Sequence, residues 1–430
     1  MITKPARSYW EKLVTVPMPH WIRVRQRFDS PAGINIAESV RNEFAKPKIR
    51  DFLRPGLSVA VGVGSRGIAS LTTLVKETID ALKAADCAPF IVPAMGSHGN
   101  ATAAGQVALL ADYGVTEEEM GVPIRATMEA ELIGQLSTGL PLYFDKHALD
   151  ADLVVPICRI KPHTGFRGGI ESGITKMLGI GFGKHIGAQA MHQRGFKMMA
   201  AHLLEAQELL LRNTPFGFGI AAVENAYKQT SLVEAVPALA LATREPQLLQ
   251  LARSWMARLP MEHLDVLVVY EIGKNISGVG MDPNITGRYF NDVESDLQVQ
   301  RIVVLNLTPA THGNAQGIGM ADVTTEQVVR QIDLNAMWVN ATTSGALPNS
   351  RIPIFMPHDR AAIQLAIKTC GQADFGQAQV AWIHNTAELS VFYASEALWT
   401  TLAENPTLSQ DGAPTPIPFN PDGSLTWKVH

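Results

Sequence analysis

Short apolar runs alternate with amphipathic helical stretches from about residue 56 onwards. The run LSVAVGVGS is apolar and β-branched, and IASLTTLVKETIDALKAA after it carries apolar residues at helical spacing. The same alternation continues through APFIVPAM, the helical part of GSHGNATAAGQVALLADYG, residues 152–158, residues 198–211, FGFGIAAVEN and residues 246–259. Apolar strands that alternate with helices predict a mostly parallel sheet that is covered on both faces.

The pattern restarts after LPMEHLD. Four more strands are predicted in LDVLVVYEIG, RIVVLNLT, RIPIFMPHD and QVAWIHN, with helices in TTEQVVRQIDLNAMWV and RAAIQLAIKTC. We therefore predict two Rossmann-like α/β domains, residues 1–262 and 263–405, and an extended tail over 406–430 that packs back on the first domain. The first fifty residues are expected to form an irregular lead-in or an edge hairpin. The default active site is the cleft between the two domains.

Composition and charge narrow the functional classes. A chain of 430 residues with 46% hydrophobic and 18% charged residues is typical of a globular protein with more than one core. The net charge of −4 and the lack of a Lys/Arg-rich run argue against nucleic acid or a membrane as partner. Three scattered cysteines without a CxxC indicate a reduced, cytoplasmic compartment. An oligomer is compatible with this composition, and the oligomeric state stays open.

Polar loops follow the predicted strands of the first domain. GVGSRG (62–67) joins a strand to a helix, where backbone N–H groups hold anions and Arg66 can bind a carboxylate. GSHGNAT (96–102) places His98 in the same layer. GVGSRG lacks the full dinucleotide-binding pattern, and its alternative is a tight turn with a solvated arginine. The alternative for His98 is a merely exposed loop histidine.

The segment of residues 159–192, RIKPHTGFRGGIESGITKMLGIGFGKHIGAQAMH, carries the densest candidate chemistry. It contains His163, Lys176, His185 and His192 around a cluster of glycines. Lys176 lies among apolar and small residues, so it either extends its ammonium to solvent or acts as a desolvated nucleophile. The histidine spacings do not form an HExxH zinc pair. We favour His163 over His185 as a functional residue.

Two loops of the second domain are also polar and glycine-rich. EIGKNISGVGMDPNITGR (271–288) retains Lys274 after a strand, and THGNAQGIGMAD (311–322) offers His312, Asn314, Gln316 and Asp322. Such loops are candidates for the far wall of the cleft, and the alternative is a surface loop with helix caps.

Taken together, these residues resemble the nickel-pincer lactate racemase family of α-hydroxy-acid racemases and epimerases. His163, Gly165–Phe166, Lys176 and His192 match the order of the family motif, with the family interval of sixteen residues between the lysine and the last histidine. The resemblance covers residues 56–195 well and the second domain loosely.

The resemblance implies a role for each matched residue. Lys176 would carry a covalent nickel-pincer nucleotide as a thioamide, and His192 would ligate the Ni²⁺. His98 and His163 would be the two catalytic bases. The remaining matches would bind the substrate carboxylate (Arg66 and Lys274) or contact the cofactor (Gly64, Ser65, Gly165, Phe166 and Glu271). The implied partners are a small hydroxy acid and the cofactor-synthesis proteins.

This sequence departs from the family pattern in three places. The loop between His163 and Lys176 is about three residues longer, Gly64 and Ser65 replace an aspartate and a threonine, and Glu271 replaces a glutamine. These changes favour a hydroxy acid that is larger or more polar than lactate, such as a sugar acid. The alternatives are a metal-dependent hydrolase or lyase with His163, His185 and His192 as ligands, or a binding protein that lost the cofactor. The roles of His185, His312 and Asp322 stay open.

Overall fold

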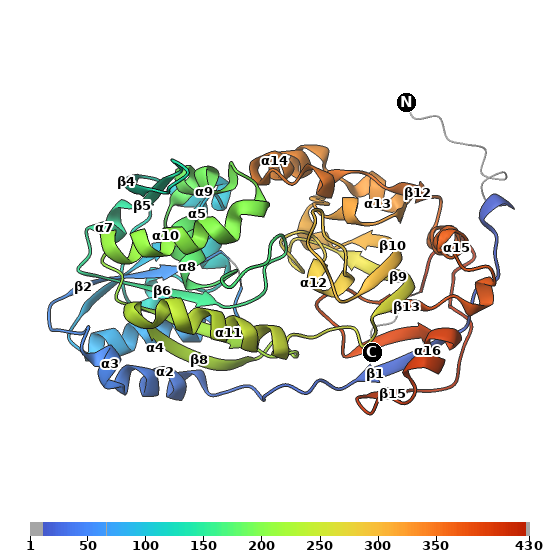
Figure 1. The fold of residues 1–430 in the computed structure, drawn as a ribbon, viewed down its shortest axis with the longest axis horizontal. Helices are drawn as coiled ribbons and strands as arrows, with labels where there is room; N and C mark the ends of the chain where they lie inside the picture. The colour runs from blue at the N-terminus through green and yellow to red at the C-terminus, as the bar shows by residue number, and fades with distance from the viewer. Residues whose placement is uncertain (1–11, 66, 427–430) are drawn as a thin grey trace. The chain divides into compact units, whose positions relative to one another are not determined.

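The computed structural model describes residues 12–65 and 67–426. Contacts divide the chain into two compact units (Figure 1). The first unit spans residues 29–256, and the second combines residues up to Phe28 with residues 257–430. Both are α/β with mostly parallel sheets flanked by helices, which confirms the predicted fold class. Within the described part of the chain, no helix has both the length and the apolar character that crossing a bilayer requires.

The first unit is built on a five-stranded sheet. Its strands run in the order β3 (Ala88–Pro93), β2 (Ser58–Val63), β6 (Leu153–Arg159), β7 (Phe218–Glu224) and β8 (Thr230–Pro237). The first four are parallel, with Val61 opposite both Ile91 and Val155, and β8 is antiparallel to β7. Nearly every residue of the central strands is buried. This explains why they appear in the sequence as continuous apolar runs.

Helices cover both faces of this sheet (Figure 1). One face packs on α2 (Ile36–Ala45), α4 (Leu71–Ala84) and α5 (Ala103–Asp112) through Val40, Leu74 and Leu110. The other face packs on α10 (Met199–Asn213) and α11 (Leu241–Trp255) through Leu203 and Leu248. The remaining elements are α3 (Pro47–Arg50), α6 (Glu117–Met120), α7 (Lys146–Leu149), α8 (Ile174–Lys176), α9 (Lys184–His192), and the hairpin of β4 (Ala130–Gln135) and β5 (Pro141–Asp145).

The second unit contains an eight-stranded sheet among its described residues. The strand order is β12 (Ile354–Met356), β11 (Val323–Thr325), β10 (Gln298–Leu307), β9 (His263–Ile272), β13 (Val380–Ile383), β14 (Val391–Ser395), β1 (Trp21–Gln26) and β15 (Leu408–Gln410). The strands from β12 to β13 are parallel, and the last three strands pair antiparallel. Its helices include α12 (Pro283–Thr286), α13 (Glu326–Gln331), α14 (Leu334–Ser344), α15 (Asp359–Thr369) and α16 (Glu396–Leu402).

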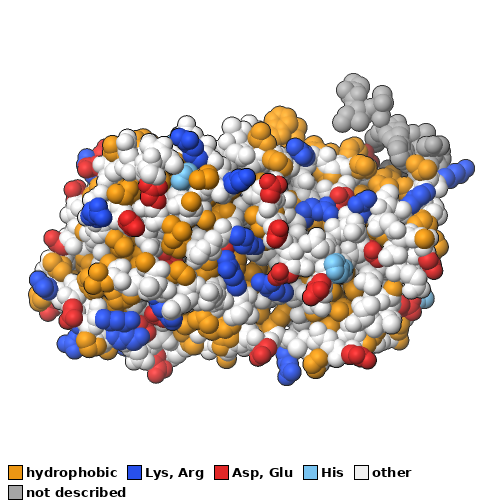
Figure 2. Space-filling view, viewed as in Figure 1, with side chains coloured by type: hydrophobic (Ala, Val, Ile, Leu, Met, Phe, Trp, Pro, Cys, Tyr) orange, Lys and Arg blue, Asp and Glu red, His pale blue; other side chains and the backbone are white. Residues whose placement is uncertain are grey.

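Surface character varies over the face shown in Figure 2, where basic and acidic side chains are interspersed. An apolar group lies over α14, which leaves Trp338 and Val339 more than half exposed.

Residues 324–339, predicted as one helix, are divided into α13 and α14 because the Asp333 side chain accepts a hydrogen bond from Ala336 N and starts a new helix.

The observed units differ from the expected domains at both ends of the chain. The N-terminal region forms β1, α2 and α3 rather than an irregular lead-in, and β1 belongs to the second unit because it pairs with β14 and β15. The tail also packs on the second unit, where Leu425 N donates to Asp359 (2.7 Å). The backbone consequently passes from one unit to the other after Phe28 and again after Met256.

Candidate functional site

The candidate residues of the first unit follow the carboxyl ends of three neighbouring strands. Gly64 and Ser65 follow β2, His98 follows β3, and His163 follows β6. The chain passes from β2 to β3 on one side of the sheet and from β6 to β7 on the opposite side, so the strand order reverses between β2 and β6. Open α/β sheets bind ligands at such a reversal of strand order. The sheet therefore places these loops where a ligand is expected.

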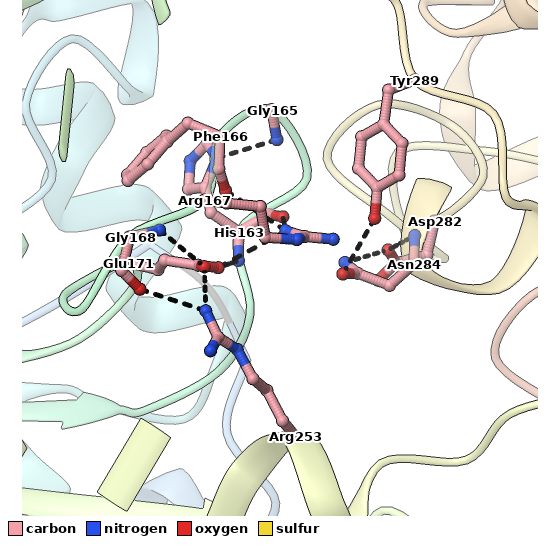
Figure 3. A network of polar contacts seen from close by, with 10 residues as sticks. All are labelled: His163, Gly165, Phe166, Arg167, Gly168, Glu171, Arg253, Asp282, Asn284 and Tyr289. Atoms are coloured by element: carbon pink, nitrogen blue, oxygen red, sulfur yellow. Dashed lines mark hydrogen bonds and ion pairs between the residues drawn. The ribbon is translucent and has the colours of Figure 1, made fainter. Parts of the chain in front are cut away.

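A buried carboxylate, Glu171, holds the loop that carries His163 (Figure 3). It accepts hydrogen bonds from the backbone of His163 (2.6 Å) and Gly168 (3.2 Å). It also forms ion pairs with Arg253 (2.5 Å) and Arg167 (3.5 Å). Arg167 in turn donates to the carbonyl of His163 (2.7 Å). This network fixes the backbone of an otherwise irregular glycine-rich loop from both sides.

The ring of His163 has a defined hydrogen-bonding state. Gly165 N donates to His163 Nδ1 (3.0 Å), so the neutral ring carries its proton on Nε2. The ring packs on Phe166 with centroids 4.3 Å apart, and Phe196 lies 6.0 Å away. Phe196 also contacts the ring of His192 at 5.7 Å. Two of the predicted site histidines therefore share one aromatic neighbour.

Lys176 lies at the end of a short helix whose start is held by Glu245. The carboxylate accepts from Thr175 N (3.1 Å) and Thr175 Oγ1 (2.5 Å), and Gln207 donates to the same hydroxyl (2.6 Å). Gly173 permits this approach, since a Cβ there would lie 2.2 Å from the carboxylate. Burial raises the pKa of Glu245 to about 7. The helix then continues through a wide turn over Met177–Gly181 into α9, which ends at His192.

His192 has a defined hydrogen-bonding state as well. Its Nδ1 lies 2.6 Å from the carbonyl of Ala188, which can only accept, so Nδ1 carries the proton and Nε2 keeps the lone pair. Burial lowers the pKa of His192; the Ala188 bond opposes this shift, and the Lys176 charge adds to it. A lone pair fixed by a hydrogen bond on the other nitrogen is the usual state of a ligating histidine.

His98 is exposed and forms a short contact with a second candidate residue. Its Nδ1 lies within hydrogen-bond distance of Ser65 Oγ, and Tyr113 OH donates to the Ser65 carbonyl (2.7 Å). Ser65 was predicted as a cofactor contact, and the structure pairs it with a predicted base. A Cβ at Gly64 would lie 2.8 Å from the terminal methyl of Met177, so the methionine side chain would have to shift. Arg66 lies outside the described residues.

In the second unit, Glu271 is the penultimate residue of β9, and Lys274 follows two residues after the strand ends. Glu271 Oε1 lies 3.2 Å from His384 Nε2, and the hydrogen bond from this imidazole lowers the pKa of the carboxyl group. The Lys274 ammonium donates to Gly278 O (2.8 Å) and Asn340 Oδ1 (2.7 Å). A separate polar cluster follows in the same loop, where Asn284 contacts Asp282 and Tyr289 (Figure 3).

The structure also places the residues whose roles were open. His185 and His312 are exposed. Asp322 pairs with Arg288 and accepts from Ile302 N (2.7 Å), so it anchors one loop to β10. Among residues 12–65 and 67–426, no three histidine, cysteine or acidic side chains are grouped as a metal site would need. The three histidines that the sequence offered as metal ligands, His163, His185 and His192, are therefore not grouped in this way.

The residues that hold these loops were not identified from the sequence. Glu171, Glu245, Lys184 and Gln106 are all buried polar side chains. Glu171 stands inside the motif GGIESG, where a carboxylate among glycines was a usable signal. Nothing local indicated its partner Arg253, which is 82 residues away.

The chain is similar to known proteins in part of its sequence and in its fold. Residues 26–201 match the family described as the lactate racemase N-terminal domain. The lactate racemase apoprotein from Thermoanaerobacterium thermosaccharolyticum has a similar fold, with a TM-score of 0.50 and 14% identity over 85% of this chain and 94% of that one. A structural genomics target from Thermotoga maritima gives a TM-score of 0.50 and 13% identity over 65% of this chain and 72% of that one. No curated protein sequence matched. Over residues 26–201, this chain is similar to the family of the lactate racemase N-terminal domain.

Proposed function

We propose that this protein is a racemase or epimerase of an α-hydroxy acid and that it works with a nickel-pincer nucleotide bound covalently to Lys176. The observation that carries the proposal is the state of His192. Its proton is held on Nδ1 by Ala188, its pKa is lowered by burial, and the charge of Lys176 acts on it. An attachment lysine beside a neutral imidazole is the donor set that such a group needs.

In this proposal Lys176 and His192 hold the cofactor. When bound, the cofactor would supply a reversible acceptor for the hydride of the substrate α-carbon. Glu245 and Thr175 fix the start of the short helix that ends at Lys176. Gly64 and Ser65 after β2, together with Gly165 and Phe166 in the His163 loop, are the proposed cofactor contacts. In the second unit, Glu271 takes this role with its carboxylate oriented by His384.

The two histidines are proposed to exchange protons with the substrate hydroxyl. His163 rests with its proton on Nε2, because Gly165 N–H occupies Nδ1. Its Nε2–H can therefore hydrogen-bond to a substrate oxygen, and the imidazolium form would return a proton to a keto oxygen and become neutral again. His98, exposed and oriented by Ser65, is the proposed base for the opposite enantiomer. Arg66 and Lys274 are proposed to bind the substrate carboxylate, which would orient the α C–H bond.

The substrate is proposed to be larger or more polar than lactate. The lowered pKa of Glu271 keeps this carboxylate charged at neutral pH. A charged group that replaces the amide expected from the resemblance favours a substrate with additional hydroxyl donors over a methyl group. A hydroxy acid of the sugar-acid type has this character.

The deciding experiment is intact-mass spectrometry of the chain co-expressed with cofactor-synthesis proteins. The proposal expects an adduct of several hundred daltons that maps to Lys176, together with nickel by elemental analysis. Lys176→Ala should lose both the adduct and the nickel. Lys197→Ala, which alters an exposed lysine close to the same helix, is the matched control and should keep both.

Two results would overturn the proposal. One is an unmodified mass in the presence of a functional synthesis pathway, which would favour a hydrolase, a lyase or a binding protein. The other is an adduct and nickel that persist in Lys176→Ala. Once loading is established, incubation of single enantiomers of lactate and of sugar acids, followed by chiral chromatography, identifies the substrate class.

A further inference from the structure

A fully buried lysine that no predicted site residue explains lies at the start of the helix that carries His192. Lys184 is the first residue of α9 and has no solvent exposure. Its backbone adopts a left-handed conformation with φ of 54°, which costs a non-glycine residue conformational energy. Strained and buried polar residues persist where the surrounding structure requires them. The contacts of Lys184 show which elements its side chain joins.

The Lys184 ammonium joins three other elements. It forms a fully buried ion pair with Asp145 at the end of β5 (2.8 Å). It donates to the carbonyl of Pro93 at the end of β3 (2.6 Å) and to Gln106 Oε1 on α5 (3.4 Å). Burial lowers the pKa of Lys184, and Asp145 opposes this shift. The start of α9 is thereby tied to the strand that leads into the His98 loop.

Gln106 continues this connection to the His98 loop itself. Its side chain is fully buried, and Nε2 donates to the carbonyls of Gly96 (3.0 Å) and His98 (3.3 Å). The loop needs such support, because the three residues after His98 all have positive φ, with values of 64°, 56° and 53°. A second link runs through the backbone, where Gly96 N donates to Gly181 O (2.9 Å).

We propose that Gln106, oriented by Lys184 and Asp145, is a positioning residue that fixes the His98 loop relative to the helix of His192. The structural part of this inference rests on the contacts alone. Its catalytic part also rests on the proposed function. The proposed result is a fixed distance between His98, the proposed proton-transfer group, and His192, the proposed nickel ligand. Neither Gln106 nor Lys184 touches the proposed reacting atoms.

The first test measures hydrogen exchange in the protein without cofactor. Gln106→Met removes both donors and keeps the side-chain length, and Gln106→Glu keeps an acceptor for Lys184 while it removes the donors. We expect both variants to raise the exchange rates of the His98, Ala101 and Thr102 amides at least tenfold. Rates in β2 and β6 should stay unchanged. Thr78→Val is the control, since it removes a buried hydroxyl bond on α4 (2.8 Å to Leu74 O) outside this network.

Two outcomes of this test would overturn the proposal. One is exchange at the loop amides that does not change in either variant. The other is exchange that rises equally throughout the first unit in both variants, which would mean that Gln106 only supports the fold. Lys184→Met is a poorer choice, because it leaves the Asp145 carboxylate buried without its ion-pair partner and endangers folding.

The second test uses the loaded enzyme. We expect kcat to fall roughly tenfold or more in Gln106→Met and Gln106→Glu, with KM within about twofold of the parent. Nickel and the Lys176 adduct should be retained, since His192 is not moved. Unchanged kcat together with faster loop exchange would overturn the catalytic consequence. If the parent protein has no racemase activity, the proposed function fails, and the exchange experiment still decides whether Gln106 positions the loop.

Discussion

At the scale of single residues, the state of His192 leads to a pH prediction. Its folded pKa is lowered by burial, so the unfolded chain takes up this proton first as the pH falls below about 6.5. Above that pH the ring is neutral in both states and does not change the unfolding free energy. Below it, the unfolding free energy falls. His192→Gln should therefore reduce the loss of unfolding free energy between pH 7 and pH 5, measured by urea denaturation. It should also lower nickel retention roughly tenfold or more.

The exposed histidine of the same helix supplies the control for this prediction. His185→Gln is the matched control, because that side chain is exposed and its loss should leave nickel retention unchanged. Equal pH slopes for His192→Gln and the parent protein would contradict the lowered pKa of the His192 imidazole. Residual acid sensitivity is expected in either variant, since burial also lowers the pKa of His202.

Single residues also show what the sequence could and could not predict about the site. The interval between Lys176 and His192 is local and lies within one helical segment, so the sequence displays it directly. The supports of that segment come from far along the chain. Glu245 reaches Thr175 across 70 residues, and Lys184 reaches Pro93 across 91. Such pairs depend on the packing of the whole sheet, which no local pattern contains.

At the scale of secondary-structure elements, the support of α8 by Glu245 gives a second pH prediction. The carboxyl pKa of about 7 lies above the unfolded value of about 4.5. The folded state therefore binds the extra proton, and its contribution to stability is complete below pH 4.5 and lost as the pH rises through 7. Glu245→Gln should make the unfolding free energy less dependent on pH between 5 and 8, by an amount on the order of 3 kcal/mol at most.

Denaturation with urea at several pH values measures this effect. Asp359, whose pKa is raised by burial to about 6, remains in the variant and leaves a smaller slope. Asp359→Asn is therefore the matched comparison, because its carboxyl group supports the C-terminal tail instead of α8. A Glu245→Gln slope identical to that of the parent would show that Glu245 does not titrate with folding.

The elements differ in how well the sequence predicted them. Buried parallel strands such as β2, β6 and β9 were located from uninterrupted apolar runs, because both faces of these strands are covered by helices. The first fifty residues were not predicted correctly. β1 is a strand only because it pairs with β14, more than 360 residues later. The helix α2 carries Ile36, Val40 and Phe44 on its buried face. This helical spacing is visible in the sequence, but the prediction of an irregular lead-in did not use it.

At the scale of the whole molecule, the path of the chain leads to a prediction about folding. The first unit is one continuous stretch, residues 29–256, whereas the second needs the N-terminal strand. Trp21 of that strand stacks on Tyr393 (4.0 Å) and meets the edge of Trp382 (6.1 Å) in the core. Without β1, strand β14 would become an open sheet edge and β15 would lose its partner.

We therefore expect a fragment of residues 29–256 to unfold cooperatively, and a fragment of residues 257–430 to be poorly folded until a peptide of residues 12–28 is added. Circular dichroism and tryptophan fluorescence during peptide titration measure this rescue. A peptide with Trp21→Ala should bind far more weakly, since removal of a buried tryptophan typically costs about 3–5 kcal/mol. Arg27→Ala in the same peptide is the control, because Arg27 lies just beyond the last residue of β1. Cooperative folding of residues 257–430 alone would contradict the prediction, because it would mean that this half of the sheet is stable without its N-terminal strand.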